Sequence, residues 1–344
     1  MKRLLVLGFV FLAGCASVGA GPTTLTVMTH DSFSVSESVI QAFEAANDTS
    51  VAFVKSGDAG SALNKAILSR SSPLADVFYG VDNTFLARAL EADIFEAYQS
   101  PALESIPIDF RLDPSHRALP VDYGDVCINY DKSYFASRDL AVPGRLEDLV
   151  RPEYRGLLVA ENPASSSPGL AFLLATVKHF GDPAYLEYWS NMRLNGVVIV
   201  DGWETAYYTN FSGSSGQGPQ PMVVSYATSP AAEVIFAAAP LTDALTASIT
   251  GPDACFRQIE FVGILKGARQ PELARRFVDF VLSHEFQADV PGQMFVYPVL
   301  PGVTLLDVFT EYAQVPAQPA MLAPEEIALN RDAWIRAWTD VVLH

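Results

Sequence analysis

The sequence predicts a two-lobed α/β protein whose chain leaves its first lobe and later returns to it. Short apolar segments of strand character alternate with segments of helical periodicity, which is typical of lobes built on mainly parallel sheets. The 344 residues exceed the length of one ordinary domain. Half of the residues are hydrophobic and 11% are aromatic, which excludes a disordered chain.

The expected first lobe begins with three strands, each followed by a helix. Val35, Val39, Ile40 and Phe43 fall at helical spacing and define the first helix. The expected strands are 25–29, 51–54 and 75–79, and the expected helices are 35–46, 60–68 and 84–92. In such lobes ligands bind beyond the carboxyl ends of the strands, so the loops there hold the first candidate residues.

The expected second lobe begins near the segment 119–124 and includes a crossing strand at 125–130. Its main helix, 170–180, is preceded by Ser167, a good N-cap, and by Pro168, which suits the first helical position. Its further expected strands are 156–159, 197–200 and 222–225. The chain returns near 251–261 and then adds helices at 271–282 and 324–341. The predicted lobes are therefore residues 24–122 together with 256–344, and residues 123–255.

The first residues predict export followed by lipid attachment. Lys2 and Arg3 precede an apolar core at 4–11 that is too short to span a bilayer. Leu12-Ala13-Gly14-Cys15 then resembles the bacterial lipobox, in which cleavage leaves a lipid-carrying cysteine as the first residue. An ordinary secretory signal is the alternative. We expect an extracytoplasmic protein held to the membrane only by its lipid, with a signal peptide at 1–14, lipidation at Cys15 and a tether at 15–23.

Charge and motifs argue against several functions. The chain has 22 basic and 39 acidic residues, a net charge of −17, which excludes a nucleic-acid-binding surface but permits a cationic ligand. The five histidines are scattered without metal-ligand spacing, and no Gly-x-Ser-x-Gly elbow or P-loop occurs. We therefore expect a binding protein without metal or cofactor, and not an enzyme.

Acidic and aromatic side chains gather in the loops after the expected strands. Aromatic faces attract a cation by roughly 0.5–2 kcal/mol each, and a carboxylate supplies the opposite charge that a buried cation requires. This combination suits a flat cationic heterocycle. The candidate residues are Asp31, Ser32, Asp82, Trp203, Tyr207, Tyr226 and Phe295.

Three consecutive serines, 165–167, precede the helix expected at 170–180. Their hydroxyls lie beside the free N–H groups of a helix N-terminus, which makes this segment a candidate anion site. Capping of the helix alone is the alternative interpretation.

Two cysteines remain besides Cys15, and both lie near the predicted crossings between the lobes. In an oxidising compartment such a remaining pair often forms a disulfide. We expect Cys127 and Cys255 to be paired, with two buried free thiols as the alternative.

The chain resembles the thiamine-binding periplasmic proteins, which are the solute receptors of ABC importers. The resemblance covers most of the mature chain, and it implies a type II periplasmic-binding fold with the ligand in a hinged cleft between the lobes. The motifs that carry it are Leu25-Thr26-Val27, Asp31-Ser32-Phe33, Ala75-Asp76-Val77, Gly80-Val81-Asp82-Asn83, Pro120-Val121-Asp122-Tyr123-Gly124, Ser167-Pro168-Gly169-Leu170, Gly202-Trp203, Ser225-Tyr226-Ala227-Thr228-Ser229-Pro230-Ala231, Tyr297-Pro298-Val299 and Ala328-Leu329-Asn330-Arg331-Asp332-Ala333-Trp334.

The resemblance also implies roles for the candidate residues. Trp203 and Tyr226 would contact the rings of the ligand, and Asp31 and Asp82 would serve its aminopyrimidine or its thiazolium charge. Phe295 stands where the family commonly has Trp, so it keeps the stacking face but loses an N–H. Ser166 and Ser167 would contact the phosphate of a thiamine phosphate. Some relatives have an aromatic residue at the position of Ala232, and the ring of Tyr207 would take its place here.

Two other functions remain open at this point. A ferric-ion receptor of the same superfamily would use adjacent tyrosines such as Tyr207-Tyr208, because phenolates and carboxylates are good ligands for iron. An enzyme like thiaminase I would use Cys127 as a free, activated thiolate. We favour a monomeric receptor that closes on thiamine or its phosphates and delivers them to a membrane permease.

Overall fold

The computed structural model describes residues 23–213, 217–239 and 241–344. The expected signal peptide at 1–14, the lipidation site Cys15 and nearly all of the tether at 15–23 lie outside these residues. Within the described ranges, no helix is both long and apolar enough to cross a bilayer.

Three parallel strands form the sheet of the first lobe. Strand β1 (Thr23–Thr29) lies between β2 (Thr49–Lys55) and β3 (Val77–Asp82). Every residue of β3 is buried, as expected for a strand covered on both faces. The expected alternation is confirmed by the connecting helices, which are α1 (Glu37–Asn47), α2 (Ala59–Leu68) and α3 (Leu86–Glu91).

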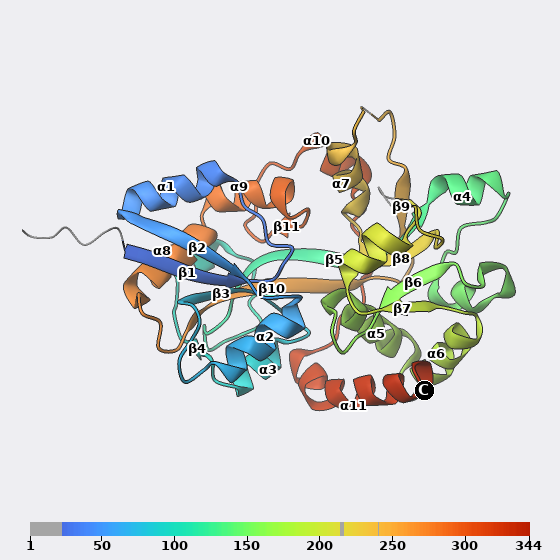
Figure 1. Ribbon diagram of the computed structural model, residues 1–344, viewed down its shortest axis with the longest axis horizontal. Helices are drawn as coiled ribbons and strands as arrows, with labels where there is room; N and C mark the ends of the chain where they lie inside the picture. The colour runs from blue at the N-terminus through green and yellow to red at the C-terminus, as the bar shows by residue number, and fades with distance from the viewer. Residues whose placement is uncertain (1–22, 214–216, 240) are drawn as a thin grey trace, which may run out of the picture.

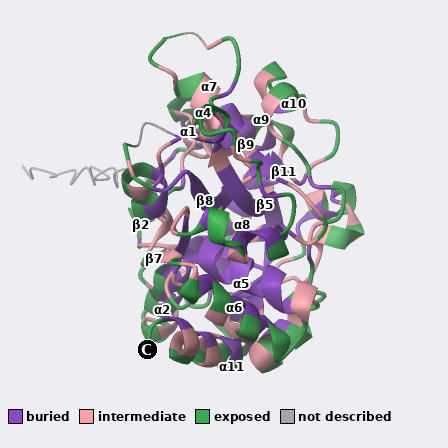
Figure 2. Ribbon diagram, turned by 90° about the vertical axis from the view of Figure 1, so that its right-hand side faces the viewer, coloured by how far each residue is buried: buried purple, intermediate pink, exposed green. Residues whose placement is uncertain are grey.

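The second lobe has the same plan. Strand β6 (Leu158–Glu161) lies between β7 (Val198–Val200) and β8 (Met222–Tyr226), and all three are parallel. The buried helix α5 (Ser167–Phe180) packs against this sheet, as Figure 2 shows in purple. The second lobe also contains the helices α4 (Lys132–Ser137), α6 (Ala184–Leu194) and α7 (Ser229–Phe236) and the strand β9 (Thr246–Ile249).

Two long antiparallel strands connect the lobes. Strand β5 (Leu119–Asp131) and strand β10 (Phe256–Leu265) pair with each other and run between the two halves of the molecule (Figure 1). Since β10 also pairs with β3 and β5 also pairs with β8, the strands form one sheet in the order β2-β1-β3-β10-β5-β8-β6-β7. Strand β5 is the first crossing, and at 119–131 it is longer than the 125–130 segment expected from the sequence.

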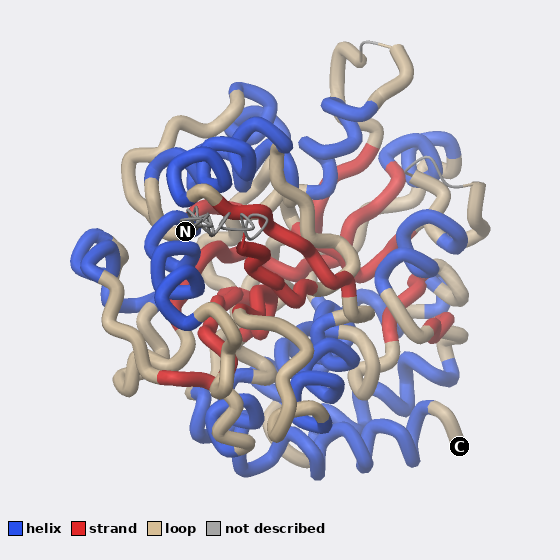
Figure 3. Tube along the Cα trace, turned by 60° about the vertical axis from the view of Figure 1, so that its left-hand side comes forward, coloured by secondary structure: helices blue, strands red, loops and turns tan. Residues whose placement is uncertain are grey.

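The C-terminal elements cover both lobes. Helix α11 (Pro324–Val342) packs against α6 in the second lobe and α3 in the first, and the Trp189 and Trp338 rings meet at 5.4 Å. Figure 3 shows the strands at the centre with helices around them. Because α11 packs against both lobes, its contacts do not mark where one lobe ends and the other begins, and the predicted lobe boundaries remain a proposal. The other elements of the described residues are β4 (Phe95–Glu96), α8 (Pro271–Val281), α9 (His284–Gln293), β11 (Tyr297–Pro298) and α10 (Asp307–Tyr312). These residues also form short 3-10 helices (Pro101–Ser105, Ile108–Phe110, Leu146–Val150, Pro152–Tyr154) and a π-helical turn (Thr205–Asn210).

Candidate ligand-binding site between the lobes

The carboxyl ends of strands from both lobes meet at the middle of the sheet. Asp82 is the last residue of β3 and Tyr226 is the last residue of β8, so both belong to strands and not to the loops in which the sequence placed them. Strand β3 continues to Asp82 because Asp82 pairs with Glu260, and strand β8 continues to Tyr226 because Tyr226 pairs with Val126. The crossing strands therefore fix both candidate side chains relative to each other.

Asp82 is fully buried and accepts four hydrogen bonds. Its Oδ1 accepts from the N–H of Thr84 at 2.7 Å and from the Thr84 hydroxyl at 2.5 Å. Its Oδ2 accepts from Gln258 Nε2 at 3.1 Å and from the hydroxyl of Ser167. Burial raises the pKa of Asp82 to about 6, against the lowering effect of the Ser167 and Thr84 hydrogen bonds. The bond to Ser167 joins the two predicted lobes directly.

Tyr226 lies among carboxylates. Its hydroxyl donates to Gln258 Oε1 at 2.9 Å, so Gln258 links it to Asp82. Burial raises the pKa of Tyr226 well above the ordinary value, and the charges of Glu260, Asp82 and Asp58 raise it further. An aromatic ring in a negative environment favours a positively charged ligand.

His30 lies in the same acidic region. Its Nε2 lies 3.5 Å from Glu260 Oε2. Burial alone would lower the pKa of His30, but Glu260, and after it Asp58 and Asp31, raise it above the ordinary value. Gly80, at φ 105°, faces the imidazole so closely that a Cβ would collide with it. His30 therefore offsets part of the negative charge of the site.

Asp31 and Ser32 lie at the exposed margin of this region. Asp31 Oδ1 accepts the N–H of Gly57 at 2.8 Å, which orders the loop after β2. Asp58 in that loop caps the N-terminus of α2 and also accepts the N–H of Ser167 at 3.4 Å. Asp58, which the sequence reasoning missed, therefore reaches the second lobe.

Ser166 and Ser167 lie at the start of α5, as expected, and both are buried. The N-cap is Ser166, one residue earlier than predicted, because Ser166 has extended backbone angles and its Oγ accepts the N–H of Gly169 at 3.5 Å. The Ser167 hydroxyl and N–H donate to Asp82 and Asp58. The donors of the candidate anion site thus bond to carboxylates of the first lobe.

Trp203 and Tyr207 form a stacked pair in the second lobe. Their ring centroids lie 5.0 Å apart and their planes differ by 21°. Trp203 Nε1 donates to Ser225 Oγ at 2.9 Å, beside Tyr226, and the Tyr207 hydroxyl donates to Glu233 at 2.5 Å. Tyr207 is buried whereas Trp203 is partly exposed, so Trp203 presents the accessible ring of the pair.

Phe295 belongs to a neighbouring aromatic cluster. Its ring centroid lies 5.0 Å from that of Phe236 and 6.2 Å from that of Phe309. The next residue, Val296, approaches the Tyr226 ring across Gly124, where a Cβ would lie 3.0 Å from the ring and 3.3 Å from Val296. The 295–296 segment therefore borders the site.

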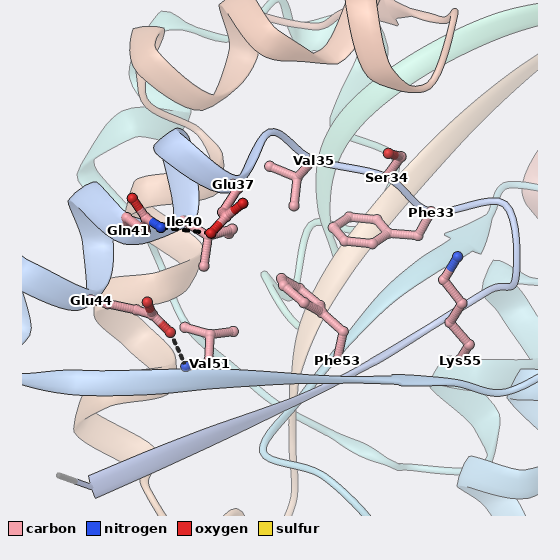
Figure 4. Close-up of a pocket in the computed structure, with 10 residues that line it drawn as sticks. All are labelled: Phe33, Ser34, Val35, Glu37, Ile40, Gln41, Glu44, Val51, Phe53 and Lys55. Atoms are coloured by element: carbon pink, nitrogen blue, oxygen red, sulfur yellow. Dashed lines mark hydrogen bonds between the residues drawn. The ribbon is translucent and has the colours of Figure 1, made fainter.

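A hollow of about 410 Å³ lies elsewhere, between α1 and β2 (Figure 4). None of the nine residues predicted to bind ligand lines it. The rings of Phe33 and Phe53 meet there at 5.0 Å. We base the candidate site on the convergence of strand ends, and not on this hollow, because the hydrogen-bonded acidic and aromatic side chains lie at the strand ends. The lining residues are Phe33, Ser34, Val35, Glu37, Ile40, Gln41, Glu44, Val51, Phe53 and Lys55.

Cys127 and the adjacent tyrosines, Tyr207 and Tyr208, are the residues that the two alternative functions would need. These functions are an enzyme like thiaminase I and a ferric-ion receptor. Cys127 and Cys255 form a disulfide with an S–S distance of 2.08 Å, which ties β5 to the residue before β10. A cysteine in a disulfide carries no thiolate for nucleophilic attack. The rings of Tyr207 and Tyr208 are nearly perpendicular, at 84°. No cluster of three or more His, Cys, Asp or Glu suited to a metal ion is found among the described residues.

Comparison with known proteins assigns the family. Residues 72–319 match the model of the bacterial extracellular solute-binding proteins. The chain is 31% identical to the thiamine-binding periplasmic protein of Salmonella typhimurium, over 95% of this chain and 96% of the relative. It is also 31% identical to that of Escherichia coli, over 95% of each chain.

Solved structures agree with this assignment. The structure of a periplasmic thiamin binding protein matches with a TM-score of 0.82 at 29% identity, over 93% of this chain and 96% of that one. A periplasmic binding protein of Actinobacillus pleuropneumoniae, with fructose-6-phosphate bound, matches in fold alone, with a TM-score of 0.77 at 19% identity over 93% and 99% of the two chains. The predicted type II periplasmic-binding fold is confirmed, and the chain belongs to the bacterial extracellular solute-binding proteins, in the family of the thiamine-binding periplasmic proteins.

Proposed function

We propose that this protein is a lipid-anchored extracytoplasmic receptor that captures thiamine or its phosphates and delivers them to the permease of an ABC importer. The observation that carries the proposal is the hydrogen-bonded connection of the Tyr226 ring, through Gln258, to the buried acid Asp82. The names of the relatives from Salmonella typhimurium and Escherichia coli support the same ligand. A monomeric receptor with its anchor at Cys15 is part of the proposal.

The chemistry of the site suits the positively charged thiazolium ring of thiamine. A cation that leaves water needs a compensating charge, which Asp82, Asp58 and Glu260 supply. The rings of Tyr226 and Trp203 add faces for stacking and for cation–π attraction. The amino group of the pyrimidine ring is a hydrogen-bond donor and pairs naturally with carboxylate acceptors.

Capture proceeds by closure of the lobes around the ligand. Closure forms the hydrogen bond from Ser167 to Asp82 and the bonds of Gln258 to Ser167 and Tyr226, because each of these joins the two predicted lobes. Open and closed forms present different surfaces, so the permease can distinguish loaded from empty receptor. Delivery then depends on the presence of ligand.

The direct test identifies the ligand of the native protein. Mass spectrometry of small molecules released from the purified protein should detect thiamine or a thiamine phosphate. Calorimetric titration of the ligand-free protein should then give saturable binding of thiamine and none of a neutral pyrimidine. Saturable binding of a different solute, with no binding of any thiamine species, would contradict the proposal.

Replacement of Trp203 tests the stacking contact. We expect Trp203→Ala to weaken thiamine binding by at least about tenfold, or about 1.4 kcal/mol, because it removes the accessible ring beside Tyr226. Trp203→Phe should lose less, since it keeps an aromatic face. Tyr134→Ala on α4 is the control. Calorimetry gives the affinities, and an unchanged affinity in Trp203→Ala would remove the stacking contact from the proposal.

A further inference from the structure

A continuous series of hydrogen bonds joins Trp203 to Glu233. Trp203 Nε1 donates to Ser225 Oγ at 2.9 Å, and Ser225 Oγ lies 2.9 Å from Ser229 Oγ. Ser229 is hydrogen-bonded to Tyr207, whose hydroxyl donates to Glu233 Oε1 at 2.5 Å. Glu233 lies on α7 and is not among the site residues predicted from the sequence. It is nevertheless connected, bond by bond, to the accessible ring of the candidate site.

The donors and acceptors in this series fix its direction. The indole N–H of Trp203 can only donate, and each hydroxyl has a single proton to donate. Tyr207 donates its proton to Glu233, so it must accept from Ser229. Ser229 then accepts from Ser225, which accepts from Trp203. Every bond therefore points towards the carboxyl group of Glu233, and bonds aligned in this way strengthen one another.

Glu233 ends the series because both of its carboxyl oxygens accept. Its Oε2 accepts the hydroxyl of Thr246 on β9 at 2.7 Å, while Oε1 accepts from Tyr207. Burial raises the pKa of Glu233 to about 7, against the lowering effect of these two bonds, and the charge of Asp131 raises it further. Among the described residues, the other titratable groups that face Glu233 are Tyr207 and Tyr208. Because burial raises the pKa of Tyr207 well above the ordinary value, Glu233 is the member of the series that titrates near neutral pH.

We propose that Glu233 is a positioning residue, which holds the stacked Trp203–Tyr207 pair through these hydrogen bonds and thereby raises the affinity of the site for a cationic heterocycle. This inference rests on the proposed function, in which the Trp203 ring contacts the ligand. When Glu233 is ionised, the hydroxyl of Tyr207 bonds to a charged acceptor, and such bonds are roughly twice as strong as neutral ones. Protonation removes the charge and turns one carboxyl oxygen into a donor. The ring pair is therefore held more firmly above about pH 7 than below it.

The first test follows the indole N–H resonance of Trp203 by nuclear magnetic resonance in the ligand-free protein. The chain has 4 tryptophans, and the resonance that disappears in Trp203→Phe belongs to Trp203. We expect its chemical shift to change with a midpoint near pH 7, because the strength of its hydrogen bond follows the ionisation of Glu233. Glu233→Gln should abolish this change because it removes the titrating group. Tyr207→Phe should also abolish it, because it interrupts the series while keeping the ring.

The matched control is Glu204→Gln, which removes an acidic charge next to Trp203 at an exposed position outside the series. It should keep the change in chemical shift that the wild type shows. A Trp203 resonance that stays constant with pH in the wild type would overturn the inference. So would a change of the same size and midpoint in Glu233→Gln or in Tyr207→Phe.

Calorimetric titration with thiamine at pH values above and below 7 tests the effect on affinity. From the higher to the lower pH, the wild type should lose about fivefold more affinity than Glu233→Gln, because only the wild type exchanges a charged acceptor for a neutral one. Equal pH dependence of the affinity in the two proteins would overturn the inference. If the wild type binds no thiamine at either pH, the proposed function is contradicted, and the ligand-free resonance titration still decides whether Glu233 holds the ring pair.

Discussion

Both carboxyl oxygens of Asp82 accept hydrogen bonds, but burial disfavours the charged form of this side chain. Its two oxygens accept four hydrogen bonds, and yet burial raises its pKa to about 6. An unfolded Asp titrates near a pKa of about 3.9, so the folded protein holds this proton more tightly between about pH 4 and pH 6. The stability from this proton is complete below about pH 4 and is lost as the pH rises through 6.

Asp82→Asn should therefore flatten the pH dependence of stability. Between about pH 4 and pH 7, the free energy of unfolding should fall more in the wild type than in the variant. The difference should approach about 3 kcal/mol, because the pKa of Asp82 is raised by about two units on folding. Urea denaturation at several pH values measures both curves. Parallel curves for the two proteins would show that Asp82 does not titrate in this range.

At the residue scale the sequence predicted part of the candidate site. Asp82 and Tyr226 could be predicted because each ends a short apolar run, and ligands bind at such strand ends. Asp58 also follows a strand, so the same rule could have found it. Gln258 and Glu260 could not be predicted, because they lie inside the crossing strand β10 and face the site only through its pairing with β3 and β5.

At the element scale, periodicity predicted the strands and helices that cover a single core. The strands β1, β2 and β3 and the helix α5 overlap the sequence-based expectations because each contains a clear apolar stretch, but β3 covers 77–82 and not the expected 75–79. Helix α6 was missed because its buried residues include Tyr185, Tyr188 and Trp189 among polar neighbours, a weak pattern. Strand β9 was missed because four residues become a strand only by pairing with β5.

The Cys127–Cys255 disulfide ties the two crossings together and closes a loop with a sequence separation of 128. A cross-link across so long a loop restricts the unfolded chain strongly. We expect the double variant Cys127→Ala, Cys255→Ala to lose about 2–5 kcal/mol of unfolding free energy. Urea denaturation of the oxidised wild type and of the variant measures this loss. A difference below about 1 kcal/mol would show that the disulfide adds little to stability.

At the scale of the whole molecule, the residues that the structure describes form one sheet of 11 strands, which extends through both lobes. The candidate site lies where β10 and β5 pass between β3 and β8, so the strands that join the lobes also hold residues of the candidate site. Side chains that approach from opposite lobes, such as Asp82 and Ser167, come into contact only when the lobes are close together. We therefore expect ligand binding and lobe closure to be coupled through these individual hydrogen bonds.

Ser167→Ala tests this coupling. Because it removes a hydroxyl that bonds to a buried carboxylate of the other lobe, it should disfavour the closed form by about 1.5–3 kcal/mol and weaken thiamine binding about ten- to a hundredfold. Small-angle scattering should show the wild type contracting on addition of thiamine, and the variant contracting only at higher concentrations. Ser137→Ala, an exposed change on α4, is the matched control and should behave as the wild type. If Ser167→Ala binds and contracts as the wild type does, the bonds of the Ser167 hydroxyl to Asp82 and Gln258 do not hold the lobes together, and the bond between Tyr226 and Gln258 must carry closure instead.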